Sequence, residues 1–162
     1  MFGAALRSRL SGHSHANDVP TEGAWLRTGD LGLYLDGEFY VTGRLADLIT
    51  VGGRNHSPED IEATTADASP LVRRGYNVAF AATQNGDDAS EVLVIVAERA
   101  AGTARVDPQQ AFDAIRAAVA RRHGLSVADV RFVPAGAIPR TTSGKLARGA
   151  CRAQYLSGDI GP

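Results

Sequence analysis

The segment Glu91–Ala97, which reads EVLVIVA, most constrains the fold of this chain because it is apolar at nearly every position. A short, almost wholly apolar run is typical of a strand that is covered on both faces. We therefore predict a strand at the centre of a sheet. A neighbouring strand is predicted at Tyr76–Ala82, joined to it by a turn at residues 84–88, and a short third strand at Val130–Val133.

A helix is predicted to open at Ser57 and to end near Ala68. Ser57 suits the N-cap because its hydroxyl can bind a free amide of the first turn, and Pro58 suits that turn because its ring fixes the backbone. The acids Glu59 and Asp60 then face the positive end of the helix dipole. These four residues together indicate where the helix starts.

A second helix is predicted over residues 108–123, where apolar residues recur at helical spacing. Its apolar face consists of Phe112, Ile115 and Val119. Gly124 is expected to end it, because glycine readily adopts the left-handed backbone that follows many helices. A last helix is predicted over about residues 146–155.

Two strand pairs precede these elements. Apolar runs on both sides of Asp36 and Gly37 predict a hairpin over residues 31–41. A second pair is predicted through Leu48–Val51, ending at Gly52 and Gly53. The order of elements predicts an α+β domain, a small mixed sheet with flanking helices plus an N-terminal β-hairpin.

The composition excludes several classes of function. With 162 residues the chain can bury a core as one domain, with room for part of a second. Its net charge of −1, with mixed signs, gives no reason to expect a nucleic-acid partner. The single cysteine, Cys151, fits a reducing compartment. No apolar run could span a bilayer, so we predict a cytoplasmic protein without a transmembrane segment.

The first 24 residues are weakly patterned. Residues 2–10 are predicted to form a strand or the end of one, and residues 11–23 a polar loop. His13 and His15 lie in that loop without ligands of another type nearby, so we interpret them as part of a linker and predict no metal site.

Lysine and arginine together number 17, and all but Lys145 are arginines. A lysine ammonium is a compact point charge on a flexible stem, which an arginine fork does not replace at a reactive centre. The alternative is an ordinary surface lysine in a chain that favours arginine. The segment before Lys145 is not a phosphate-binding loop, because Pro139 replaces the first glycine of that motif and Leu146 replaces the hydroxyl that would hold magnesium.

Three stretches in this order resemble the adenylate-forming superfamily, which includes acyl-CoA synthetases, peptide-synthetase adenylation domains, luciferases and fatty acyl-AMP ligases. Arg27–Asp30 is similar to the T-G-D motif of these enzymes. Gly43–Asp47, running on to Pro58–Glu62, resembles their hinge motif, and Pro139–Lys145 resembles their catalytic-lysine motif. The resemblance covers about residues 25–156.

This resemblance implies that residues 43–162 form a C-terminal lid domain and residues 1–42 the end of a large N-terminal domain. The sequences of Gly53–Glu62 and Thr141–Arg148 look most like the corresponding segments of fatty acyl-AMP ligases. Such enzymes use ATP and Mg²⁺ to activate a fatty acid, then pass it to the phosphopantetheine of an acyl carrier protein or a polyketide synthase carrier domain. The lid of an acyl-CoA synthetase or peptide synthetase, and a free-standing carrier-binding module, stay open as alternatives. Since ATP binds mainly to the N-terminal domain, the isolated chain is expected to be inactive.

The resemblance also assigns roles to single residues. Asp30 would bind the ribose hydroxyls of AMP, and Arg44 would contact ribose or phosphate. Lys145 would bridge the substrate carboxylate and the α-phosphate, where one ammonium can offset the repulsion between two anions. Gly52 and Gly53 would lie on the surface that faces the acceptor thiol.

The resemblance further marks Thr142, Ser143 and Gly144, directly before the lysine, as a supporting loop.

The chain departs from the family pattern at two positions. The hinge position, usually aspartate or lysine in these enzymes, is Ala46 here, with Asp47 adjacent, and Thr50 stands where several members carry lysine. We expect residues 135–144 to be mobile without adenylate, unless packing of Ile138 pins them.

Overall fold

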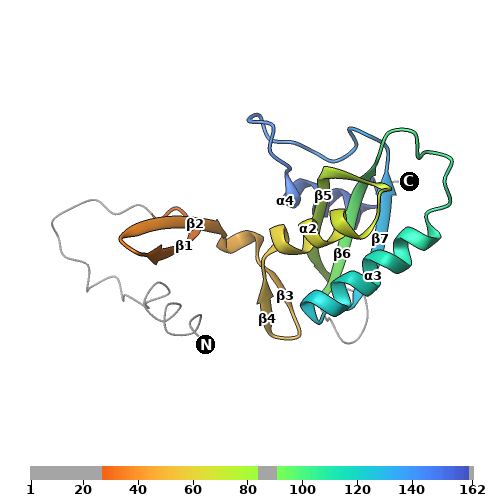
Figure 1. Cartoon of the computed structure of the whole chain (residues 1–162). Coiled ribbons are helices and arrows are strands. Elements are labelled where there is room, and N and C mark those ends of the chain that lie inside the picture. The colour runs from red at the N-terminus through yellow and green to blue at the C-terminus, as the bar shows by residue number, and fades with distance from the viewer. Residues whose placement is uncertain (1–26, 84–90, 161–162) are drawn as a thin grey trace. The chain divides into compact units, whose positions relative to one another are not determined.

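The computed structural model describes residues 27–83 and 91–160 of the chain (Figure 1). The chain divides into two compact units, Met1–Ala46 and Asp47–Pro162. The strand predicted at residues 2–10, the polar loop after it and the turn at residues 84–88 lie outside the described residues. The domain boundary after residue 42 stays a prediction.

The described part of the first unit is the predicted hairpin. Strand β1 (Asp30–Leu35) pairs antiparallel with β2 (Glu38–Arg44). The two turn residues, Asp36 and Gly37, have φ angles of 51° and 87°. Positive φ at both central positions belongs to the tight turn whose twist matches that of the flanking strands. The hairpin is therefore confirmed.

The second unit contains a three-stranded sheet in the order β5-β6-β7. Strand β5 (Val72–Thr83) is antiparallel to β6 (Glu91–Arg99), which is parallel to β7 (Val127–Val133). The sheet is thus mixed, and the apolar run at residues 91–97 lies at its centre. Both predictions are confirmed, although β5 and β7 begin earlier than expected.

Alternate residues of the central strand serve two separate cores, as the period of two in a strand requires. Leu93 and Ile95 pack in one core with α2 (Pro58–Ala68) and α3 (Gln109–His123). Val94 and Val96 pack in the other core with Ile138 of the lysine loop (residues 134–147, which carry Lys145) and with Cys151 of α4 (Arg148–Ser157). Figure 1 shows α2 and α3 on one side of the sheet and α4 on the other. This two-sided cover explains why the strand is apolar throughout.

The helix ends follow the predicted signals. The Ser57 hydroxyl accepts a hydrogen bond from the Asp60 amide at 3.3 Å, and Gly124 has the left-handed φ of 67°. In α3, Ala111 is buried with Ile115 and Val119, whereas Phe112 is half-buried and stacks on Phe132 with ring centroids 5.6 Å apart. All three residues of the predicted apolar face therefore pack in the core, and Ala111 joins them.

The last helix begins at Arg148, two residues later than predicted. Leu146 forms an antiparallel bridge with Arg140 instead, because the backbone there closes the lysine loop. A second short hairpin, β3 (Ile49–Val51) with β4 (Arg54–His56), confirms the predicted strand pair. A single 3₁₀ turn, η1 (Leu45–Asp47), spans the boundary between the two units.

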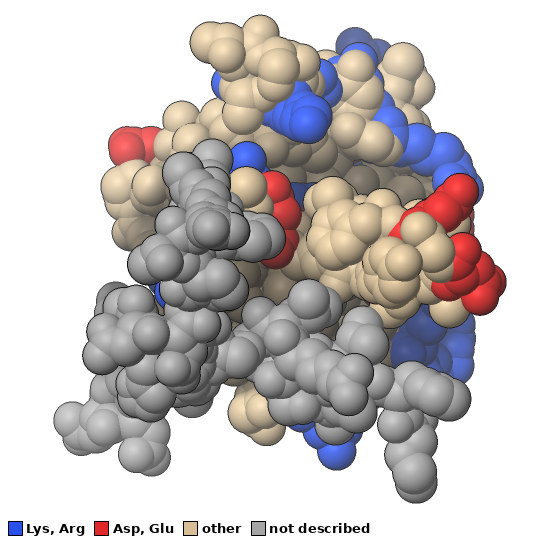
Figure 2. Space-filling model, turned by 90° about the vertical axis from the view of Figure 1, so that its left-hand side faces the viewer, with Lys and Arg blue, Asp and Glu red and all other residues tan. Residues whose placement is uncertain are grey.

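The surface carries both signs of charge. Figure 2 shows basic and acidic side chains in small separate groups among uncharged residues on the face that it presents. This mixture agrees with the net charge of −1. In the described residues, no helix is long and apolar enough to cross a membrane.

Candidate functional site

Lys145 lies at the end of a tightly hydrogen-bonded loop. The Ala147 amide donates to the Pro139 carbonyl at 2.9 Å, and the Thr141 amide donates to the Lys145 carbonyl at 2.8 Å. The Lys145 amide in turn donates to the Thr141 hydroxyl oxygen at 3.1 Å. Both backbone groups of Lys145 are therefore fixed while its side chain is exposed. A flexible stem on a fixed backbone lets the ammonium reach a bound anion without rearrangement of the loop.

The supporting residues of this loop differ in what they do. Gly144 has a φ of 81°, which disfavours any residue with a Cβ, and its amide donates to the Thr141 carbonyl at 2.8 Å. The hydroxyls of Ser143 and Thr141 lie 3.0 Å apart, and Thr142 is exposed. Thr141, which is outside the predicted set of site residues, makes the direct contact with Lys145.

The start of the loop is anchored in the core. Ile138 is 2% exposed, and its amide donates to Glu98 Oε1 at 3.3 Å. Glu98 is fully buried at the end of β6, where Arg73 Nη1 lies 2.7 Å from Oε2. A buried carboxylate needs such partners, since an unpaired one would cost several kcal/mol. At this end the structure favours a loop pinned by Ile138 over a mobile one.

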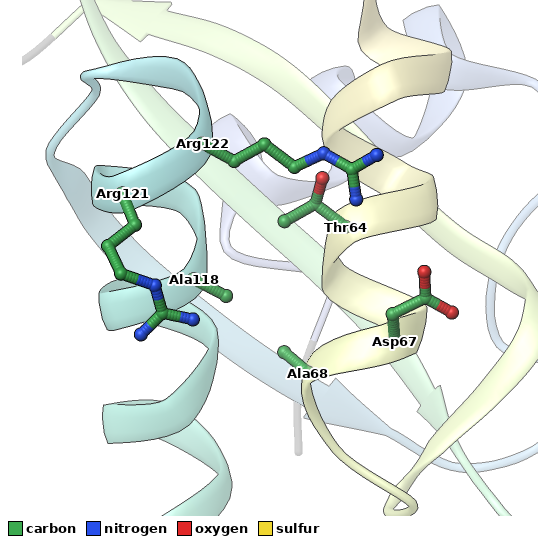
Figure 3. Close-up of a pocket in the computed structure, with 6 residues that line it drawn as sticks. All are labelled: Thr64, Asp67, Ala68, Ala118, Arg121 and Arg122. Atoms are coloured by element: carbon green, nitrogen blue, oxygen red, sulfur yellow. The ribbon is translucent and has the colours of Figure 1, made fainter.

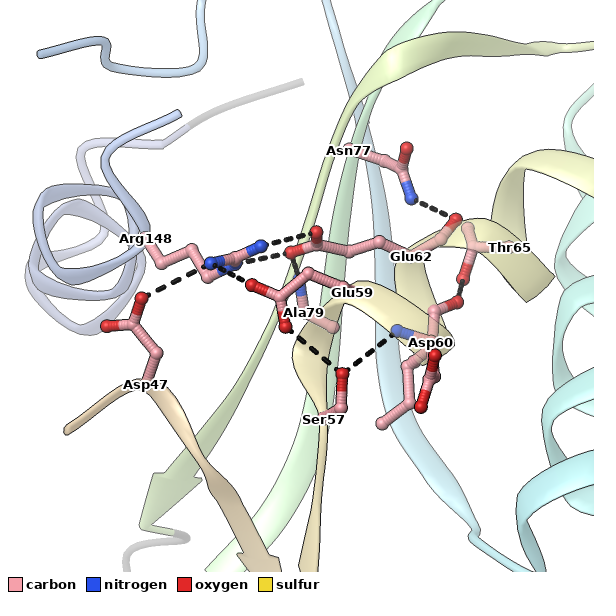
Figure 4. A network of polar contacts seen from close by, with 10 residues as sticks. Asp47, Ser57, Glu59, Asp60, Glu62, Thr65, Asn77, Ala79 and Arg148 are labelled. Atoms are coloured by element: carbon pink, nitrogen blue, oxygen red, sulfur yellow. Dashed lines mark hydrogen bonds and ion pairs between the residues drawn. The ribbon is translucent and has the colours of Figure 1, made fainter. Parts of the chain in front are cut away.

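The end of the loop is anchored by Arg148, three residues after the lysine. Its guanidinium contacts Glu62 with two hydrogen bonds of 2.7 Å, and lies 3.0 Å from Glu59 and 3.2 Å from Asp47 (Figure 4). Hydrogen bonds to Glu62 raise the pKa of Arg148 although burial opposes them, so this residue stays a cation. The pKa of Glu62 lies above its usual value because burial raises it more than the contacts with Arg148 lower it.

The hinge residues have different surroundings. Asp47 is held by Arg148, whereas the neighbouring Ala46 is exposed. Asp47 is the first residue of the second unit and Ala46 the last of the first unit. The division of the chain therefore falls at the position that the family resemblance marks, and the hinge role itself stays a prediction.

The predicted nucleotide-binding residues of the first unit are paired with each other. Arg44 Nε lies 3.3 Å from Asp30 Oδ1. The two residues face each other across the open end of the hairpin, and the Asp30 amide donates to the Thr28 hydroxyl at 3.2 Å. Both are exposed, so each can contact a ligand. Their contacts with ribose or phosphate remain a prediction.

The glycine pair forms the turn of the β3–β4 hairpin. Gly52 and Gly53 have φ angles of 58° and 73°, again the values of a two-residue turn. Below the turn, the Thr50 hydroxyl donates to Asn55 Oδ1 at 2.9 Å. Both glycines are exposed and present bare backbone, which suits close approach of an extended ligand arm.

The hollow of about 480 Å³ between α2 and α3 is a separate feature (Figure 3). Its lining residues are Thr64, Asp67, Ala68, Ala118, Arg121 and Arg122. None of these residues belongs to the predicted site. Next to it, the Thr64 hydroxyl lies 2.8 Å from His123 Nε2, and burial lowers the pKa of His123. This contact joins the two helices that cover one face of the sheet.

Residues 46–161 match the protein family described as Disco-interacting protein 2-like, AMP domain. The chain belongs to this AMP-domain family. The resemblance to adenylate-forming enzymes, and among them to fatty acyl-AMP ligases, is thereby confirmed.

Curated relatives of this AMP domain are fatty acid ligases. The long-chain-fatty-acid–AMP ligase FadD32 of Mycolicibacterium smegmatis is 46% identical over 98% of this chain and 28% of its own length. The medium-chain-fatty-acid–[acyl-carrier-protein] ligase JamA of Moorena producens is 40% identical over 90% of this chain and 24% of its own length. The chain thus spans less than a third of either relative.

A solved structure from a study of fatty acyl-adenylate ligases of E. coli and L. pneumophila has the same fold. It is 35% identical to this AMP domain, with a TM-score of 0.70 over 83% of this chain and 23% of the other. This likeness confirms the predicted α+β architecture, since the small sheets and flanking helices recur in an enzyme of the expected class.

Proposed function

We propose that this chain is the C-terminal part of a fatty acyl-AMP ligase and supplies its adenylation lysine. The observation that carries the proposal is Lys145, which has a fixed backbone and an exposed ammonium in a domain of the AMP-domain family. The relatives' names state ligation of fatty acids to AMP or to acyl carrier protein. The enzyme activity and its substrates would belong to the full-length protein.

In the first half-reaction, a carboxylate oxygen of the fatty acid attacks the α-phosphorus of ATP. The new bond gives acyl-AMP, and the bond to the β-phosphate breaks, so pyrophosphate leaves. Lys145 would place its ammonium between the two anions as they approach, where positive charge stabilises the transition state most. Mg²⁺, bound with ATP mainly by the preceding domain, would supply further charge neutralisation.

In the second half-reaction, the phosphopantetheine thiol of a carrier protein attacks the acyl carbon and releases AMP. The exposed turn of Gly52 and Gly53 would face the pantetheine arm after the lid has rotated. Rotation would take place at Ala46, the last residue of the first unit, while Arg148 holds Asp47 to the lid. This step would carry Lys145 away from the reacting atoms.

Asp30 and Arg44 would bind the nucleotide from the first unit. Their ion pair orients the Asp30 carboxylate, whose oxygens can accept hydrogen bonds from the two ribose hydroxyls. Arg44 lies within reach of the same nucleotide and would contact ribose or phosphate. We place this enzyme in the cytoplasm, where ATP and carrier proteins are available.

The hairpin would be the last part of the large N-terminal domain. None of its described residues is buried, and Tyr34, Phe39 and Val41 are 63%, 62% and 66% exposed. Large apolar side chains gathered on one small hairpin are typical of a surface that packs against another body. We expect the preceding part of the enzyme to cover them.

The test compares two acceptors with the full-length enzyme that carries this chain. We expect ATP–pyrophosphate exchange that depends on fatty acid, and transfer of the acyl group to a carrier protein that bears phosphopantetheine. Carrier protein without that group is the control for acylation of other nucleophiles. Transfer to CoA at a similar rate would instead favour an acyl-CoA synthetase. Absence of exchange with every fatty acid from C6 to C24 would contradict the proposal.

A further inference from the structure

Two arginines lie against the ring of Tyr76. The guanidinium carbon of Arg73 is 3.4 Å from the ring centroid and that of Arg140 is 4.3 Å from it. Both distances are well inside the 6 Å range over which a cation is attracted to an aromatic ring. Tyr76 therefore connects β5, where it and Arg73 are located, to the lysine loop, which carries Arg140.

Each arginine is also held at its far side. Arg73 Nη1 donates to the buried Glu98 carboxylate at 2.7 Å, and Arg140 Nη1 donates to the Gly144 carbonyl at 2.8 Å. Gly144 directly precedes Lys145. A continuous series of contacts thus runs from the central strand through Tyr76 to the peptide bond between Gly144 and Lys145.

The local backbone of β5 explains how Tyr76 reaches this position. The pairing of β5 with β6 shifts register between Val72 and Asn77, so the strand is irregular over the stretch that includes Tyr76. Gly75, inside that irregular stretch, has a φ of 74°. Irregularities of this kind re-aim a side chain that a regular strand would point elsewhere. Gly75 therefore permits the backbone turn that directs Tyr76 toward the loop.

We propose that Tyr76 is a positioning residue for Lys145, acting through Arg140 and Arg73. This inference rests on the proposed adenylation role of the lysine. The ammonium sits at the end of a flexible stem, so its reach is defined only if the backbone beneath it is fixed. Arg140 fixes that backbone from one side, and the ring of Tyr76 keeps Arg140 in place. A displacement of the order of 1 Å at such a group lowers rates strongly.

A first experiment tests this geometry without catalysis. Because Lys145 is the sole lysine of the 162 residues, a chain labelled with ¹⁵N-lysine gives one backbone amide signal. We expect an order parameter of about 0.85 for this amide in the wild type and a drop to about 0.6 in Tyr76→Leu and in Arg140→Gln. Tyr76→Phe keeps the ring and should retain the wild-type value, as should Tyr34→Leu in the first unit. An unchanged order parameter in both Tyr76→Leu and Arg140→Gln overturns the proposal.

A second experiment measures the two half-reactions of the full-length enzyme separately. Tyr76→Leu should lower adenylation about tenfold, because a displaced Lys145 ammonium stabilises the transition state less. Transfer from supplied acyl-AMP to the carrier should stay within about twofold, since Lys145 is absent from that step. Tyr76→Phe should restore adenylation. Equal losses in both half-reactions would show a merely structural tyrosine and overturn the proposal.

A double variant separates positioning from an independent effect. In a Lys145→Ala background, Tyr76→Leu should cause no further loss of adenylation, because the group that it positions is gone. A further tenfold loss would contradict the inference. If wild-type enzyme adenylates no fatty acid, the proposed function fails, and the order parameter of the Lys145 amide still decides whether Tyr76 fixes the loop.

Discussion

Arg148 and Glu62, 86 residues apart in the sequence, are joined by two parallel hydrogen bonds of 2.7 Å. This fork-to-fork contact connects the first residue of α4 to α2, and the same guanidinium reaches Glu59 and Asp47. Because Arg148 follows Lys145 by three residues, the pair fixes where the lysine loop ends. Two-point contacts of this kind fix orientation as well as distance.

Arg148→Gln should lower the free energy of unfolding of the chain by about 3 kcal/mol, since it leaves the carboxylate of Glu62 without its partner in a mostly buried place. The Arg148 and Glu62 side chains are only 18% and 12% exposed. Urea denaturation of the 162-residue chain measures the loss.

The matched control is Arg74→Gln. Arg74 also binds an acid of α2, Asp67, at 2.9 Å, but the two side chains are 73% and 57% exposed. Exposed pairs contribute about 0.5 kcal/mol or less, so this variant should remain close to wild type. Equal effects of the two substitutions would show that burial of the Arg148 pair has no special weight.

Ser57→Ala should destabilise the chain by about 1 kcal/mol, because the Asp60 amide loses the hydroxyl that accepts its hydrogen bond at the start of α2. Ser57→Asp should keep most of the stability, since aspartate caps equally well. Thermal unfolding compares the three proteins. A loss in Ser57→Asp as large as in Ser57→Ala would argue against capping as the cause.

The fold was largely predictable because its signals are local. The apolar run at residues 91–97, the Asp36 turn, the Ser57 cap and the Gly124 end each depend on neighbouring residues, and the structure bears out each of them. The first residues of α4 were misassigned, because Leu146 pairs across the lysine loop with Arg140. That bridge depends on tertiary closure, which the pattern of one helix does not contain.

The site was only partly predictable, for the same physical reason. Lys145 stands out in the sequence as a lone lysine among arginines. Glu98 and Tyr76, by contrast, act on the loop from 40 and more residues away, through a buried carboxylate and a ring. One signal was present: Glu98 follows directly on an apolar strand, and a buried acid requires a partner. Nothing in the sequence indicates which partner.

The stability of the chain should fall more steeply at high pH when Cys151 is present. Burial raises the pKa of the Cys151 thiol from 9.0 to about 12. The native state then keeps a proton that the unfolded chain loses, so this contribution is complete below pH ~9 and is lost as the pH rises toward ~12. The free energy of unfolding should decline by up to about 1.4 kcal/mol per pH unit more in wild type than in Cys151→Ala.

Urea denaturation between pH 8 and pH 11 measures that difference in slope. Cys151→Ala is expected to be less stable at every pH because it leaves a cavity in the core around α4, so the slope and not the absolute value carries the test. Parallel curves for the two proteins would mean that the thiol titrates alike in the folded and unfolded chains.

The central claim concerns Lys145 in the full-length enzyme. Lys145→Ala should cut adenylation by at least ~10²-fold, equivalent to roughly 3 kcal/mol of transition-state stabilisation. Lys145→Arg should fail as well, since the wider guanidinium cannot take the place of a point charge between two anions. The wild type and both variants would be compared at saturating ATP and fatty acid.

The decisive measurement is the rate of each half-reaction in Lys145→Ala, with acyl-AMP supplied for the second. We predict that adenylation falls at least ~10²-fold while loading of the carrier phosphopantetheine stays within several-fold of wild type. A similar fall in both half-reactions would indicate a structural lysine, and unchanged adenylation would contradict the account outright.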